Sequence, residues 1–317
     1  MTFKYNNVFI NDTYTIVGPL ENEGPLRNYF NKFYNDYYFK CNNFDEAESS
    51  ILKECILKLD KPDLIISGDL QNQIASSSFA VKDIEVPYLG VFSACATIVE
   101  SMIIGSNMIE KNQIKSCICS TSSHNNTAEK QFRFPIEYGG FKPKTTTYTV
   151  TGAASAFISR KKSNIKIESA TIGKIVDKNI KNPYQMGAVM APAFIDTLNT
   201  HLKDLNRKSD YYDLILSGDL GIYGKEIVND ILKLKNYDDT ACMIYDINKQ
   251  NVYSGGSGPA CAPLVLFSYI FNLMKNKKLK KVLLIATGSL HNPASVNEKR
   301  SIPSIAHAIS LEYYDIN

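Results

Sequence analysis

Cys95 is the residue of this 317-residue chain whose type and position most favour chemistry. It follows an apolar stretch, 88–92, that predicts a buried strand, and it opens an apolar segment, 94–110, that predicts a helix. A cysteine at the start of a helix lies at the positive end of the helix dipole, which lowers the pKa of a thiol and favours a nucleophilic thiolate. The small residues on either side of Cys95 are also what a tightly packed helix start requires, so a structural thiol is the alternative.

Two histidines follow apolar strands within the same local pattern, Ser-x-His-Asn, at 122–125 and 289–292. Open α/β sheets bind their ligands beyond the carboxyl ends of the strands, so His124 and His291 could each serve as an acid, a base or a donor to an anion. An imidazole that is hydrogen-bonded inside a turn is the alternative for both. The remaining histidines are assigned to structure because they have no such placement.

Two further segments could bind an anion. The glycine turn 255–258 precedes an apolar helix and could offer backbone N–H groups, but it lacks the lysine of a nucleotide P-loop. The polar stretch 126–146, expected to be a long loop, carries Lys130, Arg133 and Tyr138. The guanidinium fork and the aromatic ring suit a planar carboxylate ligand. The alternative interpretation is close packing of two backbones for the glycine turn and contacts between subunits for the loop.

A duplication organises these residues. The stretch 63–70, Asp-Leu-Ile-Ile-Ser-Gly-Asp-Leu, returns almost unchanged at 213–220, and the cysteine and histidine segments recur in the same order. Ordered matches at a nearly constant spacing indicate two similar halves, which we place at 1–175 and 176–317. Asp69 and Asp219 end the repeated strands, where turn or cap geometry is the expected common purpose and a functional role is the alternative.

The alternation of elements predicts a mostly parallel sheet covered by helices. Helices are expected at 45–59, 94–110, 194–205, 223–234 and 261–274, and strands at 64–66, 88–92, 116–120, 214–216, 241–245, 282–285 and 304–311. Strands between 146 and 175 are expected to form a hairpin that closes the first half.

Composition excludes several classes of protein. A hydrophobic content of 44% with 21% charged residues is typical of a globular chain, and a net charge of +3 with interspersed signs predicts no nucleic-acid partner. The seven cysteines lack metal-ligand spacing and fit a reducing compartment. The N-terminus lacks the apolar core of a signal peptide, and no apolar run reaches the roughly 18 residues of a membrane span. The lysine-rich stretch 275–281 is either a solvated turn or a contact for anionic lipid.

The segment 92–97, Phe-Ser-Ala-Cys-Ala-Thr, within a duplicated chain resembles the nucleophile segment of the thiolase and ketoacyl-synthase superfamily. That resemblance implies a thiolase-like, duplicated five-layer αβαβα fold. Condensing enzymes of the superfamily add a histidine after the strand equivalent to 214–216 and an asparagine or histidine in the later glycine turn. This chain has Ser217-Gly-Asp219 and Gly256-Ser-Gly258 in those places, which predicts little catalytic power.

Longer motifs are similar to the stage V sporulation protein AD family over nearly the whole chain. They include Thr15-Ile-Val-Gly-Pro19, Ser67-Gly-Asp-Leu-Gln-Asn-Gln73, Ala128-Glu-Lys-Gln-Phe-Arg-Phe-Pro135, Tyr148-Thr-Val-Thr-Gly152 and Ser301-Ile-Pro-Ser-Ile-Ala-His-Ala308. The chain departs from the family pattern at Thr240, at Pro259-Ala260 and at His291-Asn292, all around the site of the second half.

The resemblance implies a non-catalytic protein that binds dipicolinate (pyridine-2,6-dicarboxylate), alone or with calcium, for uptake into the developing spore. It also implies a homodimer without cofactor or bound metal, made on the cytoplasmic side and peripheral at the spore inner membrane, beside membrane-embedded SpoVA-type proteins. The residues expected to bind the ligand are Cys95, His124, Lys130, Arg133, Tyr138, Thr151, Ser257 and His291.

Two rival functions stay open on the sequence. One is an acyl-transfer enzyme that uses Cys95 as nucleophile and His124 or His291 as base. The other is an assembly scaffold that docks to membrane partners through 126–146 or 275–281.

Overall fold

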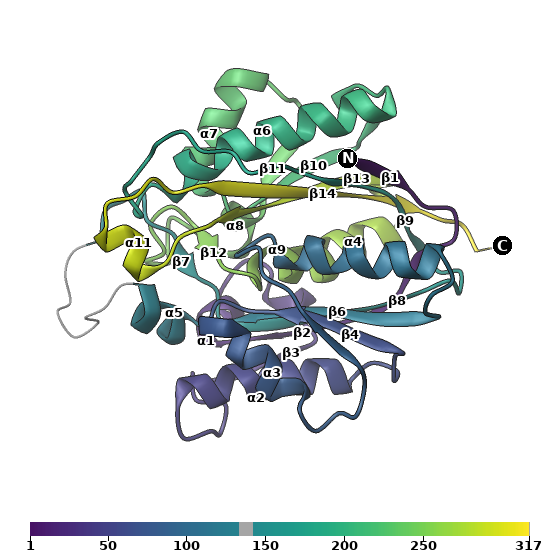
Figure 1. Cartoon of the computed structure of the whole chain (residues 1–317), viewed down its shortest axis with the longest axis horizontal. Helices are drawn as coiled ribbons and strands as arrows, with labels where there is room; N and C mark the ends of the chain where they lie inside the picture. Colours follow the sequence, from purple (N-terminus) through teal and green to yellow (C-terminus); the bar gives the residue numbers. More distant parts are fainter. Residues whose placement is uncertain (133–141, 317) are drawn as a thin grey trace.

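The computed structural model describes residues 1–132 and 142–316. Helices and strands alternate in five layers, as Figure 1 shows, with two sheets separated by a central layer of helices and covered on their outer faces by others. This arrangement confirms the expected five-layer fold. From one outer face to the other the helices are α2 (Phe44–Leu57) and α3 (Ala75–Val81), then α4 (Thr97–Glu110), α9 (Cys261–Val265) and α10 (Phe271–Lys275), then α6 (Met186–Leu205) and α7 (Gly221–Leu232).

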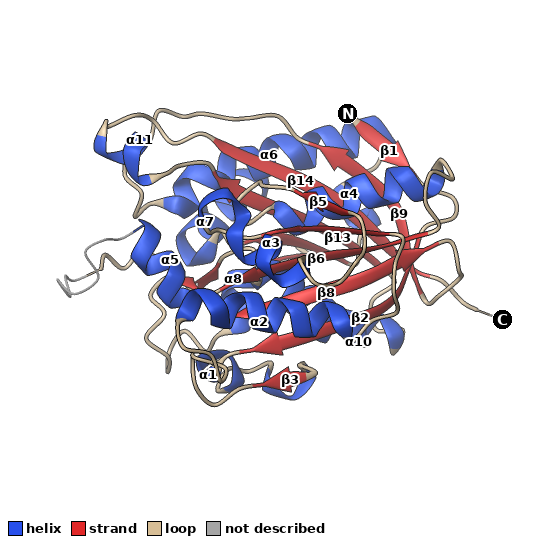
Figure 2. Cartoon of the chain, turned by 60° about the horizontal axis from the view of Figure 1, so that its bottom comes forward, coloured by secondary structure: helices blue, strands red, loops and turns tan. Residues whose placement is uncertain are grey.

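The two sheets repeat one strand order, which is the structural form of the duplication. The first runs β2 (Phe9–Val17), β8 (Gly152–Ser159), β6 (Ser116–Ser123), β4 (Leu64–Gly68) and β5 (Tyr88–Gly90). The second runs β9 (Ile165–Ile172), β14 (Ser304–Tyr313), β13 (Lys281–Ser289), β10 (Leu214–Gly218) and β11 (Tyr237–Asp239). The sheets join where β2 pairs with β9 at Phe9 and Ile10. In Figure 2, α2 and α3 lie across the outer face of the first sheet.

Short elements complete the described chain. They are β1 (Thr2–Lys4), α1 (Pro19–Asn22), β3 (Lys32–Phe33), α5 (Asn125–Phe132), β7 (Tyr148–Thr149), α8 (Thr240–Ile244), β12 (Gly256–Ser257) and α11 (Pro293–Asn297). No helix in the two described ranges combines the length and the apolar character needed to cross a bilayer.

The duplicated aspartates Asp63 and Asp213 have the same local purpose in both halves. The carboxylate of Asp63 accepts hydrogen bonds from the backbone N–H groups of Lys115 (2.7 Å) and Ser116 (3.3 Å), at the start of β6. Asp213 accepts equivalent bonds from Lys280 (2.6 Å) and Lys281 (2.9 Å), at the start of β13. Each aspartate therefore ties the start of one parallel strand to the start of its neighbour, and the carboxyl ends of the strands stay free to form a site.

The segment that carries Cys95 is a sharp elbow rather than a plain helix start. Ala94 lies in the left-handed region at φ 50°, and α4 begins two residues after Cys95. The elbow is pressed against β13, because a Cβ added to Gly288 would lie 2.1 Å from the carbonyl oxygen of Ser93. Only glycine allows this approach, which fixes the cysteine at the boundary of the two halves.

Three expectations about single elements are wrong. Residues 240–244 form α8 rather than a strand, because the side chain of Asp239 caps the backbone N–H of Ala241 and a short apolar run does not by itself decide between helix and strand. Residues 125–132 form α5 rather than a loop. β8 and β9 form no hairpin, because β2 lies between them. β9 also pairs with β14 of the second half, so the boundary after residue 175 stays a prediction.

Candidate functional site

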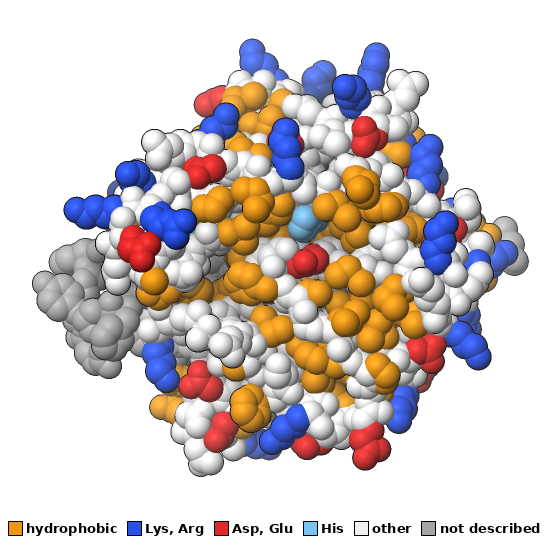
Figure 3. Space-filling model, in the orientation of Figure 1, with side chains coloured by type: hydrophobic (Ala, Val, Ile, Leu, Met, Phe, Trp, Pro, Cys, Tyr) orange, Lys and Arg blue, Asp and Glu red, His pale blue; other side chains and the backbone are white. Residues whose placement is uncertain are grey.

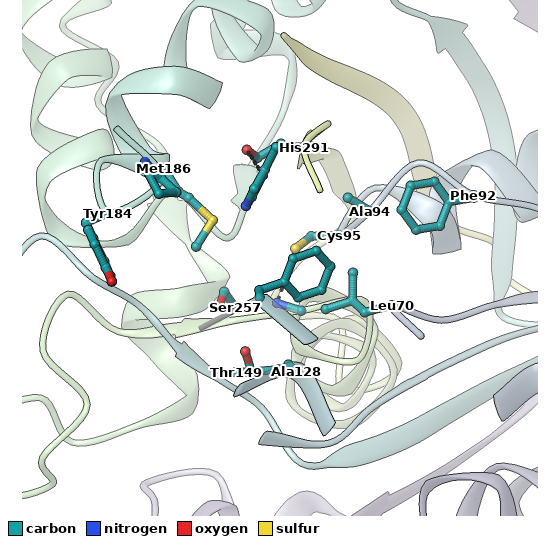
Figure 4. Close-up of a pocket in the computed structure, with 14 residues that line it drawn as sticks. Leu70, Phe92, Ala94, Cys95, Ala128, Thr149, Tyr184, Met186, Ser257 and His291 are labelled. Carbon is teal, nitrogen blue, oxygen red and sulfur yellow. Dashed lines mark hydrogen bonds between the residues drawn. The ribbon is translucent and has the colours of Figure 1, made fainter. Parts of the chain in front are cut away.

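A pocket lies where the carboxyl ends of the central strands of both halves meet the Cys95 elbow (Figure 4). Its lining combines apolar groups with a few hydroxyl, thiol and imidazole groups. The lining residues are Leu70, Phe92, Ala94, Cys95, Ala128, Phe132, Thr149, Pro183, Tyr184, Met186, Ser257, Gly258, Ser289 and His291. Among these described lining residues there is no Lys, Arg, Asp or Glu, so the wall carries no fixed charge.

Cys95 stands at the inner end of this pocket and is held by the glycine turn of the second half. Its Sγ accepts a hydrogen bond from the backbone N–H of Gly258 at 3.2 Å. Burial, with the nearby carboxyl of Asp219 adding to it, raises the pKa of the Cys95 thiol well above its ordinary value. Burial beside an acid, two residues before α4, opposes the thiolate stabilised by a helix dipole and favours the alternative, a structural thiol.

Asp219 lies behind Cys95 and does not repeat the role of Asp69. In the first half, Asp69 accepts from the backbone N–H groups of Gln71 (2.8 Å) and Ser77 (2.7 Å), which is cap geometry as expected. In the second half Asp239 takes over that task, accepting from the N–H groups of Leu220 and Gly221 at 3.0 Å each. Asp219, at φ 67°, is thereby free to lie beside the thiols of Cys95 and Cys261.

The protonation of Asp219 follows from its surroundings. The carboxyl is fully buried, and burial together with the charge of Asp239 raises its pKa to about 8. At pH 7 the Asp219 carboxyl is therefore mostly protonated. The pKa of the Cys95 thiol is raised as well, so neither Cys95 nor Asp219 places a negative charge at the pocket near neutral pH.

Ser257 and His291 join Cys95 in the pocket, as the sequence predicted for this group. The Ser257 hydroxyl accepts a hydrogen bond from Thr147 Oγ1 at 2.9 Å, which leaves its own hydrogen to donate. His291 lies within hydrogen-bond distance of Ser289, 3.1 Å from Nδ1 to Oγ, and its ring centroid is 5.6 Å from that of Phe132. Figure 4 shows the imidazole, the Cys95 sulfur and the Met186 side chain converging on one space.

His124 lies outside the pocket although it is the sequence equivalent of His291. Its Nε2 bonds the carbonyl oxygen of Tyr37 at 2.8 Å, and its Nδ1 accepts from the backbone N–H of Asn126 at 3.1 Å. The rings of Phe39 and Phe44 pack against it, and burial lowers its pKa to about 4. His124 is therefore a neutral structural imidazole that does not line the pocket, and its expected contact with the ligand stays a prediction.

Two further residues expected to bind the ligand, Thr151 and Lys130, do not line the pocket. Thr151 is buried, and its hydroxyl accepts from the backbone N–H of Asn125 at 3.0 Å, which anchors the start of α5. Lys130 is exposed on α5 and lies 3.5 Å from the carboxylate of Asp45. Arg133 and Tyr138 lie outside the described residues, so their expected contacts with the ligand stay predictions.

The walls of the pocket include residues that the sequence did not indicate. Pro183, Tyr184 and Met186 come from the segment that leads into α6, and no motif marks them. Leu70 and Thr149, by contrast, lie within the repeated strand segment and the Tyr148-Thr-Val-Thr motif, which could have drawn attention to them. No group of three or more side chains suited to a metal ion occurs in residues 1–132 and 142–316.

Comparisons with known proteins show which family the chain resembles. The sequence model of the stage V sporulation protein AD (SpoVAD) family matches residues 1–312. Stage V sporulation protein AD of Bacillus subtilis (strain 168) is 41% identical over 319 residues, which cover 96% of this chain and 94% of that protein.

Solved structures with the same fold are much more distant in sequence. A cerulenin-bound variant of OleA from Xanthomonas campestris superposes with a TM-score of 0.65 at 12% identity, over 98% of both chains. The 3-oxoacyl-[acyl-carrier-protein] synthase III of Aquifex aeolicus VF5 gives 0.60 at 12% identity, over 96% of this chain and 100% of that one. At this identity the likeness shows the thiolase-like fold alone.

Proposed function

The chain belongs to the stage V sporulation protein AD family, and from that premise we propose that it binds dipicolinate without catalysis, for uptake into the developing spore. The observation that carries the proposal is the pocket at Cys95, which joins Ser257 and His291 within apolar walls and holds no fixed negative charge near neutral pH. Such a site suits an anion with an aromatic ring, whereas a condensing enzyme needs a thiolate at this position.

The chemistry of dipicolinate matches the lining of the pocket. The planar pyridine ring requires apolar walls, and Leu70, Phe132 and Met186 supply them. Its carboxylates require hydrogen-bond donors, which Ser257 and His291 offer from neighbouring turns. We propose that Arg133 and Lys130 add positive charge, because the described lining holds none.

Titration calorimetry with dipicolinate, with and without calcium, tests the proposal. Ser257→Ala and His291→Ala each remove one donor to a carboxylate and are expected to weaken binding roughly 10- to 150-fold, since such a bond contributes about 1.5–3 kcal/mol. Ser209→Ala, in a turn outside the pocket lining, is the matched control and is expected to bind like the unchanged protein. Absence of binding at millimolar ligand in both conditions would remove the proposal.

Acyl transfer at Cys95 is the enzymatic alternative, favoured only by the likeness to condensing enzymes. We infer that it does not operate, because both the raised pKa of the Cys95 thiol and the aspartate in place of the expected histidine oppose it. Incubation with acyl-CoA followed by mass spectrometry separates the two functions. A stable acyl adduct that disappears in Cys95→Ser would favour the enzyme.

We propose that two copies associate through the edge of the first sheet. β5 pairs only with β4 among the described strands, so its outer backbone groups can accept a second strand. Leu89 on β5 is 42% exposed, and Ile104 and Met108 on α4 are partly exposed beside it in the layered fold. Figure 3 shows apolar side chains gathered across the middle of the face on which α4 lies in Figure 1.

Sedimentation velocity measures this association directly. Leu89→Lys is expected to convert the dimer into a monomer because it places a charge at the centre of the proposed contact. Leu57→Lys changes a leucine on α2 that is more exposed than Leu89 and serves as the control. A monomer in the unchanged protein at tens of micromolar would contradict the proposal.

We further propose that the protein works at the surface of the spore inner membrane beside membrane-embedded SpoVA-type proteins. The finding that no described helix can span a bilayer is compatible with a peripheral position. A lysine-rich end of the molecule supports contact with anionic lipid, and its test is argued in the Discussion.

A further inference from the structure

A second cavity, the outer hollow, lies beside the pocket, and the proposed ligand site does not use it. Its own lining comprises Gln71, Asn72, Gln73, Ile74, Gly90, Val91, Gln131, Leu290 and Asn292. Leu70, Phe92, Phe132 and His291 line both cavities and therefore form the partition between them. The volume of the hollow is about 500 Å³, against about 70 Å³ for the pocket. The hollow therefore has room for a hydrated ligand, and the pocket does not.

Carboxamide side chains dominate the lining of the hollow. Gln71, Asn72, Gln73, Gln131 and Asn292 contribute them, and no charged side chain belongs to the described lining. Such groups can hold a carboxylate through N–H donors without the strong attraction of a cation. The hollow is therefore suited to a loosely held anion that keeps part of its hydration.

Two of the carboxamides are oriented so that they present donors. The Oε1 atom of Gln131 accepts from the backbone N–H of Asn72 at 3.0 Å, and the Oδ1 atom of Asn292 accepts from the backbone N–H of Ser295 at 2.9 Å. Because both oxygens are bound to the backbone, the ends of the two side chains that remain to meet a ligand are NH₂ groups. Gln131 is next to Phe132 and Asn292 is next to His291, so both donors flank the partition.

The backbone at the hollow is strained in a way that keeps these groups in place. Gln73 and Ile74 are consecutive residues in the left-handed region, at φ 59° and 50°. That conformation is a marked outlier for a β-branched residue such as isoleucine, and strain of this kind concentrates at functional sites. The bond from Ile74 N–H to the carbonyl oxygen of Gln71 (2.8 Å) and the Asn72–Gln131 bond hold the turn.

We propose that the outer hollow is an access subsite, in which the NH₂ groups of Gln131 and Asn292 hold a dicarboxylate before it passes the Phe132–His291 partition into the pocket. This inference rests on the proposed function, because it takes dipicolinate as the ligand. It adds a second, weaker site in series with the first. It also assigns His291 to both sites, since the imidazole borders each cavity.

The double variant Gln131→Glu with Asn292→Asp is the sharpest test. Each substitution keeps the oxygen that the backbone uses and replaces the NH₂ donor by a carboxylate oxygen of the same size, and aspartate is a good N-cap for α11. Gln113→Glu, exposed after the end of α4, adds one negative charge of the same kind away from both cavities and is the control. The proposed second copy would lie near Gly90, so the oligomeric state of each variant is checked by sedimentation.

Equilibrium dialysis against dipicolinate up to millimolar concentration counts the bound ligands, and stopped-flow tyrosine fluorescence gives the association rate. We expect two bound ligands in the unchanged protein and in Gln113→Glu. In the double variant we expect one, bound to the pocket within about threefold of its original affinity, with association at least tenfold slower.

The outcomes separate this inference from the function on which it rests. One bound ligand in the unchanged protein, or two in the double variant with unchanged rates, would overturn the access subsite and leave the pocket proposal standing. Absence of any bound ligand would remove both.

Discussion

At the scale of single residues, Cys95 and Asp219 are neighbouring buried groups of which only one is expected to be ionised. Burial raises the pKa of both groups, to about 8 for Asp219 and well above its ordinary value for the Cys95 thiol. As pH rises the charge therefore forms on the carboxyl first, and that charge opposes formation of the neighbouring thiolate. Cys95 therefore keeps the elbow geometry of a nucleophile, but formation of its reactive thiolate is suppressed.

Asp219→Asn is expected to make Cys95 more reactive. The amide preserves the shape of the side chain and removes the charge, so the fraction of thiolate at pH 9 should rise, and alkylation by iodoacetamide should accelerate at least roughly threefold. The rate is measured by mass spectrometry of the Cys95 peptide, with the half-buried Cys41 of the same molecule as internal reference. Equal or slower alkylation of Cys95 in the variant would contradict the role given to Asp219.

The part of the site that could be predicted is the part set by the duplication. Cys95 and His291 follow the recurring strands β5 and β13, whose carboxyl ends meet at one edge, and Ser257 lies in the glycine turn that comes before Cys261. His124 obeys the same pattern and still turns away, because the segment before α2 supplies Tyr37 and Phe39 to enclose it. That segment has no periodicity from which its path could be predicted.

At the scale of elements, the layers bury ionisable groups in forms that make stability depend on pH. Burial raises the pKa of Glu21 from 4.5 to about 7 and that of Asp219 from 3.8 to about 8. Burial lowers the pKa of His124, His201 and His307 from 6.5 to about 4. The buried carboxyls are therefore protonated in the folded state at pH values where they are ionised in the unfolded chain. The buried histidines are neutral in the folded state at pH values where they are protonated in the unfolded chain.

Stability is expected to fall as pH rises from 6.5 to 8.5. Over this range the carboxyls of the unfolded chain are already ionised. The folded state keeps Glu21 and Asp219 protonated until the pH passes their folded pKa values. Each group therefore lowers the free energy of unfolding by about 1.4 kcal/mol for each pH unit of increase below its folded pKa. The histidines offset part of this fall just above pH 6.5, where the unfolded imidazoles still lose protons, and none of it once the unfolded imidazoles are neutral. Thermal unfolding followed by circular dichroism at several pH values measures the slope.

The slope itself distinguishes the buried carboxyl from a general charge effect. Asp219→Asn is expected to flatten the decline, whatever its effect on absolute stability, because it removes one of the buried carboxyls responsible, which also include Glu21 and Glu48. Asp230→Asn changes an exposed aspartate and is expected to leave the slope unaltered. A melting temperature that is constant or rises between pH 6.5 and 8.5 would contradict the assignment.

The elements that sequence patterns mispredicted are the short ones. α2 and α4 are long, and their apolar spacing is sufficient to predict them. α8 spans five residues, and its identity depends on a cap from Asp239 rather than on periodicity. The order of β8, β2 and β9 depends on long-range pairing, which no local pattern reports.

At the scale of the whole molecule, the pocket and a lysine-rich end lie at opposite ends of the strands. The pocket is beyond the carboxyl end of β13, whereas α10 leads into a lysine-rich turn that precedes the start of that strand. Lys161 and Lys162 of the β8–β9 turn line one shallow depression together with Lys275 and Ile316. Segments more than one hundred residues apart thus build a single basic surface around an exposed apolar side chain.

This surface has the composition of a peripheral contact with lipid. Lys162 lies over the ring of Tyr314 and Lys277 over that of Tyr313, at 5.6 and 5.3 Å from the ring centroids. Tyrosine rings beside lysine side chains suit the headgroup region, where each lysine near an anionic surface contributes about 1 kcal/mol. If this end meets the membrane, the pocket faces away from it and stays open to ligand.

Vesicles that contain phosphatidylglycerol are therefore expected to bind the protein at low salt and to release it as the ionic strength rises, since the Debye length shortens to about 8 Å at 0.15 M. The double variant Lys275→Glu with Lys278→Glu reverses two charges of the basic surface and should weaken binding at least tenfold in a flotation assay. Lys178→Glu with Lys181→Glu makes the same change in the exposed segment before α6, on the side of the pocket, and should bind like the unchanged protein. Equal losses in the two variants would indicate a net-charge effect, and no binding to anionic vesicles at low salt would contradict the proposed contact with lipid.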